Sequence, residues 1–433
     1  MRAKRPLTFW PLVAATYFMV AGGPYGLEEL VQKTGFARAM LILLITPVVW
    51  SLPTALMIGE LSTAMPDDGG FYLWVTRALG PFWRFQEAWL SLVASIFDMA
   101  LYPTLFVLYL SRLWPVASSG HNAVFIALAV IIACVIWNLF GAASVGGGSV
   151  LMSVVLLAPF AVLIIFALIK MNLVTTSNIA AKSTVPADLL GGILIAMWNY
   201  QGWDNASTVA GEVADPQRTY PLAMLVAVAL VTVTYLLPVG AVALTGADPT
   251  NWTTGSWVDV ANSLAGRYLG VAIVIGGMIG AFGAFNSLVM SYSRLPFAMA
   301  EDRLLPKLFT RRLANGAPWV AIIACGVAWS LALGLSFTRL IILDILLYGL
   351  SLILEFIALI ALRIREPQML RPFRVPGGTA VAILLGVFPT LLIGLALIRN
   401  RHEQIGSVSS LTIGLALMAA GVPAFWLARQ RRK

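Results

Sequence analysis

Acidic side chains recur inside stretches of this chain that are otherwise apolar. Two sets of polar residues repeat one helical spacing of i, i+4, i+7 and i+11: Ser91, Ser95, Asp98 and Tyr102, and then Asp344, Tyr348, Ser351 and Glu355. That spacing places the members of each set on one face of a helix. A charged side chain in mid-membrane costs roughly 2.5–3.5 kcal/mol on insertion scales, so such acids are candidates for function. The two stripes predict a polar cavity between helices.

Two chemical roles fit an acid in that cavity. The acid can pair with the ammonium group of a substrate, or it can exchange a proton. The alternative is that Asp98 or Glu355 only hydrogen-bonds a neighbouring helix. The functional interpretation is favoured for Asp98, and both interpretations stay open for Glu355.

Glycine and proline interrupt two of the apolar stretches at matching positions in the two halves of the chain. The first break reads Ala-Gly-Gly-Pro-Tyr-Gly at residues 21–26, and the second reads Asn-Tyr-Gln-Gly-Trp-Asp at residues 199–204. Such breaks free backbone groups that lipid cannot satisfy, so they must be buried in protein or line a cavity. A single break is explained by a packing kink. The matching pair predicts the substrate site of a transporter.

The polar groups of the two breaks suit different parts of a substrate. The N–H groups of Gly22, Gly23 and Tyr25 precede a half-helix whose positive dipole end favours a carboxylate. Groups that would instead bind an ammonium are the carbonyls of Ala21 and Asn199 and the carboxylates of Asp98, Asp204 and Glu355.

Aromatic residues flank the second break. Tyr200 and Trp203 are expected to stack on an ammonium by cation–π attraction or to close over the substrate as a gate. For Trp198 a site role and a packing role are equally open, because most of the 14 tryptophans are expected in interfacial belts or in packing.

Acids near the ends of the spans predict gates. Glu28 and Glu29 follow the first break by one turn, and one of them is expected to face the outer vestibule while the other is a solvated charge. Glu60 and Glu212 lie near the inner ends of the second and sixth spans. Inner-gate salt bridges are expected there with one of three arginines: Arg294, Arg303 or Arg218.

Two serines bear on ion coupling. Ser291 and Ser293 are candidates to join carbonyls of the first break around a cation. The alternative is that each serine bonds a backbone carbonyl one turn back. Proton coupling is expected, whereas sodium is possible but not supported.

The composition is that of a membrane protein. Of the 433 residues, 60% are hydrophobic and 11% are charged, whereas a soluble domain carries about 25% charged residues. About twelve apolar runs are long enough to cross a bilayer, which predicts an all-α polytopic fold. The expected spans are 8–34, 37–64, 85–113, 122–140, 147–171, 188–211, 220–244, 268–299, 318–336, 338–362, 379–398 and 407–428.

The net charge of +9 is distributed along the chain as in a membrane protein and does not indicate nucleic acid binding. With both termini cytoplasmic, 19 of the 28 Lys and Arg residues fall on inner segments, which is the positive-inside bias. The partners expected are the lipid bilayer of the cell membrane and a small organic amine.

The distance between the breaks leaves room for five spans in each of two repeats. One transporter domain is expected over residues 1–433, with a first repeat at 8–171, a second repeat of opposite orientation at 188–362, and two further helices at 379–428. The polar outer connection at 246–267 is expected to contribute a lid.

An embedded enzyme would need a nucleophile–base pair or a cluster of metal ligands. The two histidines, His121 and His402, lie at outer loop edges, and Cys134 and Cys325 lie in apolar stretches where packing is their expected role. We therefore expect no catalytic residue, metal or cofactor.

Three inner loops resemble signature segments of the amino acid–polyamine–organocation superfamily of permeases. They begin at Gly59-Glu60-Leu61-Ser62, at Ala210-Gly211-Glu212-Val213 and at Ser293-Arg294-Leu295-Pro296. Further segments are similar to the polyamine-uptake, L-type-like branch: residues 22–28, 98–103, 198–204 and 353–358. The resemblance implies alternating access with polyamines ahead of neutral or cationic amino acids as substrates.

The chain departs from the family pattern at two places. Gly202 precedes Trp203 where the pattern has tyrosine, and it is expected to loosen the backbone beside the site. A lysine in the fifth span replaces a proton or sodium ion in some relatives, but residues 147–169 contain no charged side chain.

Overall fold

The regular structure is almost entirely helical. The computed structural model describes residues 7–171, 188–335, 337–400, 404–405 and 407–430. Within these residues, nine helical segments are long and apolar enough to cross a membrane: Phe36–Ala64, Pro81–Ser111, Gly120–Asn138, Ala142–Ile169, Pro216–Ala243, Arg267–Glu301, Arg339–Arg365, Gly378–Arg399 and Ser410–Gln430.

Those nine segments are built from labelled helices. Phe36–Ala64 combines α3 (Phe36–Thr46), a π-helical turn η1 (Pro47–Ser51) and α4 (Leu52–Ala64). The single helices are α6 (Pro81–Ser111), α7 (Gly120–Asn138), α8 (Ala142–Ile169), α10 (Pro216–Ala243), α12 (Arg267–Tyr292) with α13 (Arg294–Glu301), α15 (Phe337–Arg365), α16 (Gly378–Asn400) and α17 (Ser410–Gln430).

Three of the twelve expected spans are made of shorter pieces. The first consists of α1 (Phe9–Val20) and α2 (Glu28–Thr34), and the sixth of α9 (Leu189–Asn199) and the 3-10 helix η4 (Trp203–Glu212). The ninth consists of α14 (Trp319–Trp329) and η6 (Ser330–Ala332), and its expected last residue, Ser336, lies outside the described residues.

The helices stop where the glycines and prolines predict. Residues 21–27 separate α1 from α2, and Gly23 and Gly26 there have φ of 86° and 91°. Residues 200–202 separate α9 from η4, and Gly202 has a φ of 92°. A positive φ is accessible to glycine and strained for other residues, so both interruptions are local consequences of sequence.

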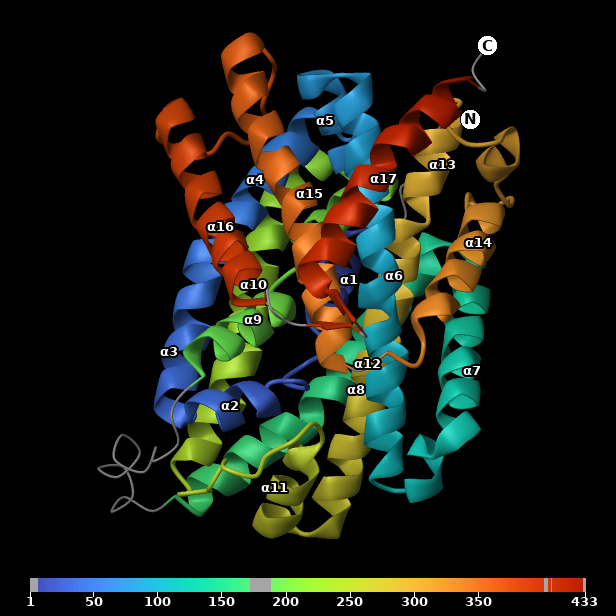
Figure 1. Cartoon of the computed structure of the whole chain (residues 1–433). Helices are drawn as coiled ribbons and strands as arrows, with labels where there is room; N and C mark the ends of the chain where they lie inside the picture. The colour runs from blue at the N-terminus through green and yellow to red at the C-terminus, as the bar shows by residue number, and fades with distance from the viewer. Residues whose placement is uncertain (1–6, 172–187, 336, 401–403, 406, 431–433) are drawn as a thin grey trace.

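Short elements cap the bundle at both ends. They are α5 (Phe71–Leu79), η2 (Pro115–Ser118), α11 (Ser256–Ala265) and η5 (Lys307–Thr310). The antiparallel pair of β1 (Gln404–Ile405) and β2 (Val408–Ser409) instead connects α16 to α17 about midway along the bundle in Figure 1. The helix α5 follows the second span directly. The helix α11 lies within the outer connection that was expected to form a lid.

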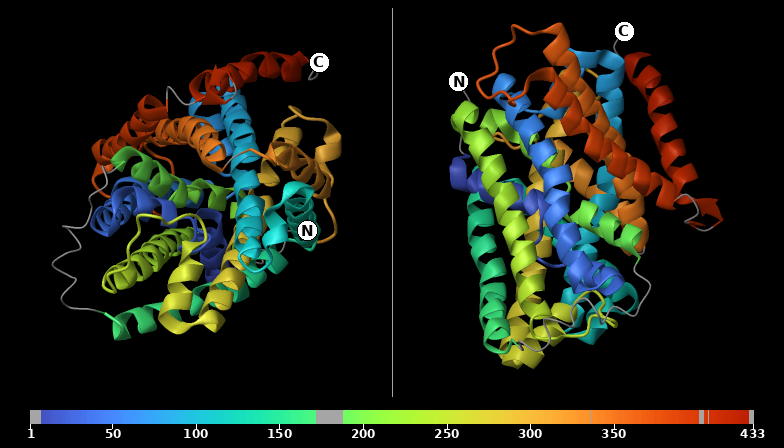
Figure 2. Two further views of the ribbon diagram at one scale, coloured as in Figure 1. Left: turned by 60° about the horizontal axis from the view of Figure 1, so that its bottom comes forward. Right: turned by 90° about the vertical axis from the view of Figure 1, so that its left-hand side faces the viewer.

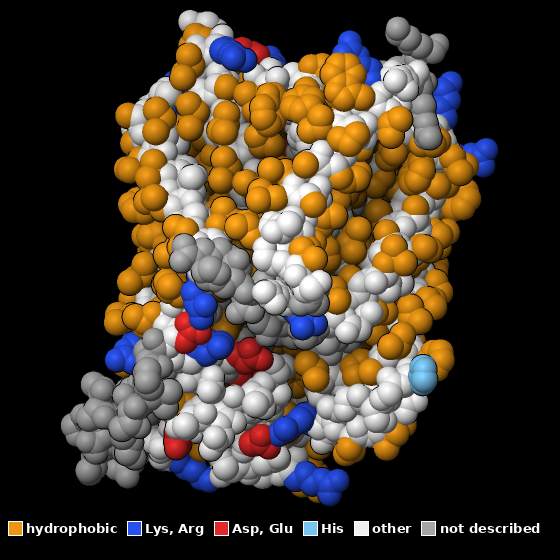
Figure 3. Space-filling model, viewed as in Figure 1, with side chains coloured by type: hydrophobic (Ala, Val, Ile, Leu, Met, Phe, Trp, Pro, Cys, Tyr) orange, Lys and Arg blue, Asp and Glu red, His pale blue; other side chains and the backbone are white. Residues whose placement is uncertain are grey.

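The long helices run between two polar ends. In Figure 1, α5, α13 and the C-terminal end of α17 lie at the top, and α2 and α11 lie at the bottom; Figure 2 shows the same bundle from two other sides. Hydrophobic side chains form a broad band on the face shown in Figure 3, with most charged side chains above or below it. This distribution fits a bundle embedded in a bilayer. Of the two histidines, His402 lies outside the described residues.

Candidate functional site

The two breaks lie against each other at the centre of the bundle. A Cβ atom on Gly202 would lie 2.5 Å from the carbonyl oxygen of Met19 in α1. The N–H of Gly202 also donates to the Tyr348 hydroxyl at 3.0 Å. Gly202 therefore permits a close approach between η4 and α1.

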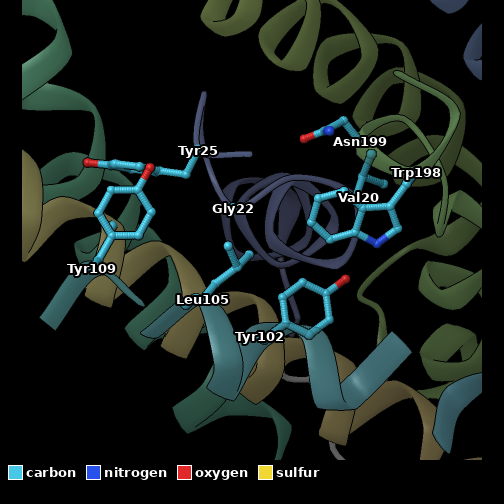
Figure 4. A pocket seen from close by; sticks show the side chains of 10 residues that line it. Val20, Gly22, Tyr25, Tyr102, Leu105, Tyr109, Trp198 and Asn199 are labelled. Carbon is cyan, nitrogen blue, oxygen red and sulfur yellow. The ribbon is translucent and has the colours of Figure 1, made fainter. Parts of the chain in front are cut away.

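A small cavity lies beside the breaks (Figure 4). Its volume is about 20 Å³, which holds about one water molecule. Its lining combines the two breaks with α6 and α12: Val20, Gly22, Tyr25, Tyr102, Leu105, Tyr109, Trp198, Asn199, Gly277 and Ala281. Four predicted site residues are therefore brought together here, namely Gly22, Tyr25, Tyr102 and Asn199.

Aromatic rings make up much of the cavity wall. The ring centroids of Tyr25 and Tyr109 are 4.8 Å apart on one side. The rings of Tyr102 and Trp198 are 6.5 Å apart across from them. Their faces are the cation–π surfaces nearest to the cavity.

Two predicted aromatic contacts lie elsewhere. The Tyr200 hydroxyl donates to the Leu43 carbonyl in α3 at 2.9 Å. The indole N–H of Trp203 donates to the Tyr200 carbonyl at 2.6 Å. Neither side chain lines the cavity, whereas Trp198, for which a packing role was equally open, does.

Some backbone N–H groups of the first break already donate hydrogen bonds to nearby residues of the chain. Ala21 N–H donates to the Tyr17 carbonyl at 2.6 Å, and Gly26 N–H donates to a Glu28 carboxylate oxygen at 2.7 Å. Among the described residues, no hydrogen bond is found from the N–H groups of Gly22 and Gly23. These two groups remain available to a ligand, while the Gly26 N–H is already held by a carboxylate.

Three aspartates surround the second break. Asp98 in α6 accepts hydrogen bonds from the hydroxyls of Tyr102, at 3.1 Å, and Tyr292, at 3.5 Å. Asp204 accepts one from the Tyr348 hydroxyl at 2.5 Å. Asp344 in α15 accepts one from the side-chain amide of Gln201. The partners recorded for these three carboxylates are neutral groups.

The polar stripes of α6 and α15 face each other, as their spacing predicted. The hydroxyl oxygens of Ser91 and Ser351 are 2.8 Å apart. Glu87 accepts hydrogen bonds from both serines. Glu355, one turn beyond Ser351, is fully buried, and neither of its carboxylate oxygens has a hydrogen-bond partner in the described part of the chain.

Several residues of this centre were missed by sequence reasoning. Glu87 lies four residues before Ser91, so extending the first stripe by one turn would have found it. Gln201, Tyr292 and Tyr109 carry no comparable signal, because their importance depends on which helix faces which.

The side of the site towards α11 is covered through Glu28. Its carboxylate accepts hydrogen bonds from the Tyr109 hydroxyl and from Gly255 N–H, the latter at 2.9 Å. Trp257 of α11 donates to the Pro24 carbonyl at 2.9 Å. The outer connection thus closes over the first break, with Glu28 buried beneath it and Glu29 bonded to its edge through Thr254.

The opposite side, towards α13, is covered by ion pairs. Glu212 pairs with Arg294 at 2.7 Å, as one of the expected alternatives. Glu60 instead pairs with Arg363 and, at 3.2 Å, with Arg371. The expected partners of Glu60 were therefore wrong, because the segment after α15 folds back onto the end of α4.

Within the part of the chain that the structure describes, no hydrogen bond joins a carbonyl of the first break to Ser291, near the end of α12, or to Ser293, just after it. Ser291 donates to the backbone and side-chain oxygens of Asn205, at 2.9 and 2.8 Å. Ser293 donates to the Met290 carbonyl at 3.4 Å, which resembles the local bond expected as the alternative.

Comparisons with known proteins agree with this architecture. The protein-family model for amino acid permeases matches residues 7–420 of this chain. The chain is 33% identical to the polyamine transporter RMV1 of Arabidopsis thaliana, over 95% of this chain and 84% of that protein. It is 34% identical to the polyamine transporter PUT1 of Oryza sativa subsp. japonica, over 96% and 78%. It is 27% identical to the serine/threonine exchanger SteT of Bacillus subtilis (strain 168), over 89% and 87%.

The helical bundle and these similarities define the class of protein: a membrane transporter and not an enzyme. The chain belongs to the amino acid permease family, within the amino acid–polyamine–organocation superfamily that its loops resemble.

Proposed function

We propose that the chain is a secondary active transporter that moves polyamines by alternating access and couples their movement to protons. The observation that carries the proposal is a set of five buried acids inside the bundle, of which Asp98 is bonded to Tyr102 in the wall of the aromatic cavity: Glu87, Asp98, Asp204, Asp344 and Glu355. None of the ion pairs found among the described residues includes one of these five.

Buried carboxylates without cationic partners favour a cationic ligand. A buried charge is costly unless it is paired, and an ammonium supplies both the opposite charge and hydrogen-bond donors. The faces of Trp198 and Tyr102 add cation–π attraction at the cavity wall. When no amine is bound, protons can neutralise the same carboxyl groups, which is why we propose proton coupling and not sodium coupling.

The first break supports an amine more than an amino acid. An amino acid would bring its own carboxylate to the N–H groups at the start of the second half-helix. Here the Gly26 N–H is already held by Glu28. A polyamine has no carboxylate, so the hydrogen bond between Gly26 and Glu28 does not compete with its binding.

The second candidate is an amino acid exchanger or permease without polyamine activity. The observation that favours it is the pair of N–H groups on Gly22 and Gly23, which remain available among the described residues. The similarity to a protein named a serine/threonine exchanger points the same way.

The proposed transport cycle opens one cover at a time. Twelve spans arranged as two inverted five-helix repeats with two added helices, and with both termini cytoplasmic, would place the breaks near the membrane midplane. The outer cover would open when Glu28 releases Tyr109 and the outer connection. The inner cover would open when Glu212 and Glu60 release their arginines. The cell membrane is the proposed location.

The test is transport by the purified protein in proteoliposomes. Uptake of labelled spermidine would be measured with an imposed inward proton gradient and with unlabelled putrescine, arginine, leucine or alanine as competitors. The proposal expects accumulation that requires the gradient and that putrescine blocks. Vesicles that exchange an amino acid but never accumulate spermidine would establish the second candidate.

A further inference from the structure

A second pair of acids lies further towards the inner end of the same two helices. Because α6 and α15 run in opposite directions and meet at Ser91 and Ser351, their residues can be placed on common levels. Asp98 and Asp344 each lie seven residues outward of the serines, about 10 Å at 1.5 Å per residue. Glu87 and Glu355 each lie four residues inward, about 6 Å.

The inner pair is less satisfied than the outer pair. Glu355 is fully buried, and neither of its oxygens has a hydrogen-bond partner in the part of the chain that the structure describes. One oxygen of Glu87 is equally unpartnered, while the other is held by Ser351 and Ser91. Natural proteins rarely leave several buried polar atoms without partners unless a ligand or ion supplies them.

We propose that Glu87 and Glu355, with the hydroxyls of Ser91 and Ser351, form a second ammonium subsite that binds the far end of a linear polyamine. This inference rests on the proposed function and adds a length requirement to it. The first ammonium binds at Asp204, whose partner Tyr348 lies between the level of Asp344 and that of Glu355 on α15. The methylene chain then lies between α6 and α15.

The spacing fits a triamine better than a short diamine. Asp204 is bonded to Tyr348, which lies seven residues before Glu355 on α15, about 10.5 Å along the helix. An extended chain advances about 1.2 Å per bond. The terminal nitrogens of spermidine are nine bonds apart, so they span about 11 Å. The five bonds of putrescine span about 6 Å, too little to reach both levels.

The experiment compares amines of different length on carriers with and without the inner acids. Glu355→Gln and Glu87→Gln would be reconstituted beside the wild type, with Glu301→Gln as the control because Glu301 is an exposed acid at the inner end of α13. Inhibition constants against the uptake of labelled spermidine would be measured for unlabelled putrescine, spermidine and 1,8-diaminooctane. The two nitrogens of 1,8-diaminooctane are nine bonds apart, as in spermidine, but it has no central amine.

The wild type and the control are expected to bind the two nine-bond amines more tightly than putrescine. Glu355→Gln is expected to raise the inhibition constants of both nine-bond amines about tenfold, which corresponds to about 1.4 kcal/mol, and that of putrescine less than twofold. Glu87→Gln should show the same selective loss, so the inference stays testable if one variant does not fold.

Three results would overturn the inference. An equal loss for all three amines would show that the inner acids support the fold or the first subsite. An unchanged length preference, with the proton requirement lost, would make the pair a proton site only. A wild type that transports amino acids but no amine would overturn the proposed function together with this subsite, whereas the first two results leave the proposed function standing.

Discussion

At the scale of single residues, the cavity wall is aromatic and the carboxylate of Asp98 lies directly behind it. The hydroxyl of Tyr102 joins the two layers, because its ring lines the cavity and its oxygen donates to Asp98 at 3.1 Å. Trp198 stands across from it on α9. An ammonium leaving the cavity for Asp98 would therefore pass between two ring faces.

Trp198→Ala should weaken spermidine binding while Trp198→Phe restores most of it. A cation–π contact contributes about 0.5–2 kcal/mol, so the alanine variant should raise the KM about 2- to 30-fold. The measurement is the KM for spermidine uptake in proteoliposomes. Equal losses in the two variants would assign Trp198 to packing and not to substrate contact.

At the scale of elements, the close contact between η4 and α1 depends on Gly202. Gly202→Ala should destabilise the protein by about 1–3 kcal/mol, because the new Cβ meets the Met19 carbonyl oxygen and the φ of 92° is strained for alanine. The measurement is the thermal midpoint of the protein in detergent. Gly147→Ala is the control, because a Cβ there meets nothing within 4 Å and alanine favours the helix. An unchanged midpoint for Gly202→Ala would contradict the close packing.

The start of α9 depends on Asp188, a partly exposed residue that directly precedes the helix. Its side chain accepts a hydrogen bond from Gly191 N–H at 2.9 Å and lies 3.5 Å from Lys33 and 3.7 Å from Arg399. Partial burial opposes ionisation, but the Gly191 N–H and the two cations outweigh it and lower the pKa of Asp188. The ionised cap therefore stabilises the folded state.

Asp188→Ala should cost about 1 kcal/mol at pH 7, the usual value of a helix N-cap. Because the folded pKa is depressed, this stability is fully present above the unfolded pKa of about 3.9 and is lost as the pH falls through the lower folded value. The difference in thermal midpoint between variant and wild type should shrink as the pH falls from 7 towards 3. A difference that grows with falling pH would contradict the sign of the shift.

At the scale of the whole molecule, the site is covered on both sides. The outer cover is a buried carboxylate, Glu28, bonded to backbone and tyrosine groups. The inner cover uses ion pairs with arginine, on Glu212 and Glu60. The two covers therefore share no carboxylate.

Arg294→Ala should open the inner cover selectively, because breaking a buried ion pair costs about 3–5 kcal/mol. The reporter is Thr208→Cys on η4, which is fully buried and within 3.0 Å of Ser291, while the native Cys134 and Cys325 are buried. Labelling by a membrane-impermeant thiol reagent from the inner side should accelerate at least tenfold. The control is Arg218→Ala, because Arg218 is an exposed residue at the same end of the bundle. Faster labelling in Arg218→Ala as well, or unchanged labelling in Arg294→Ala, would contradict the role of Arg294 in the inner cover.

The sequence predicted those features that depend on local spacing. The polar stripes follow from helical periodicity, and the breaks at 21–26 and 199–204 follow from glycine and proline. Partners distant in the chain could not be predicted: Glu60 pairs with Arg363, 303 residues away. The tryptophan that faces the cavity could not be predicted either. Trp203 lies in the 3-10 helix η4 and does not line the cavity, whereas Trp198, near the end of α9, does.

The measurement that tests the central claim most directly is spermidine uptake by Asp98→Asn compared with Asp67→Asn. Asp98 is 4% exposed and bonded to hydroxyls, whereas Asp67 is an exposed aspartate in the inner loop after α4. If the buried acids bind the ammonium groups of the substrate, Asp98→Asn should lose at least nine-tenths of the uptake at equal protein content, and Asp67→Asn should match the wild type. Full spermidine uptake by Asp98→Asn would contradict the account.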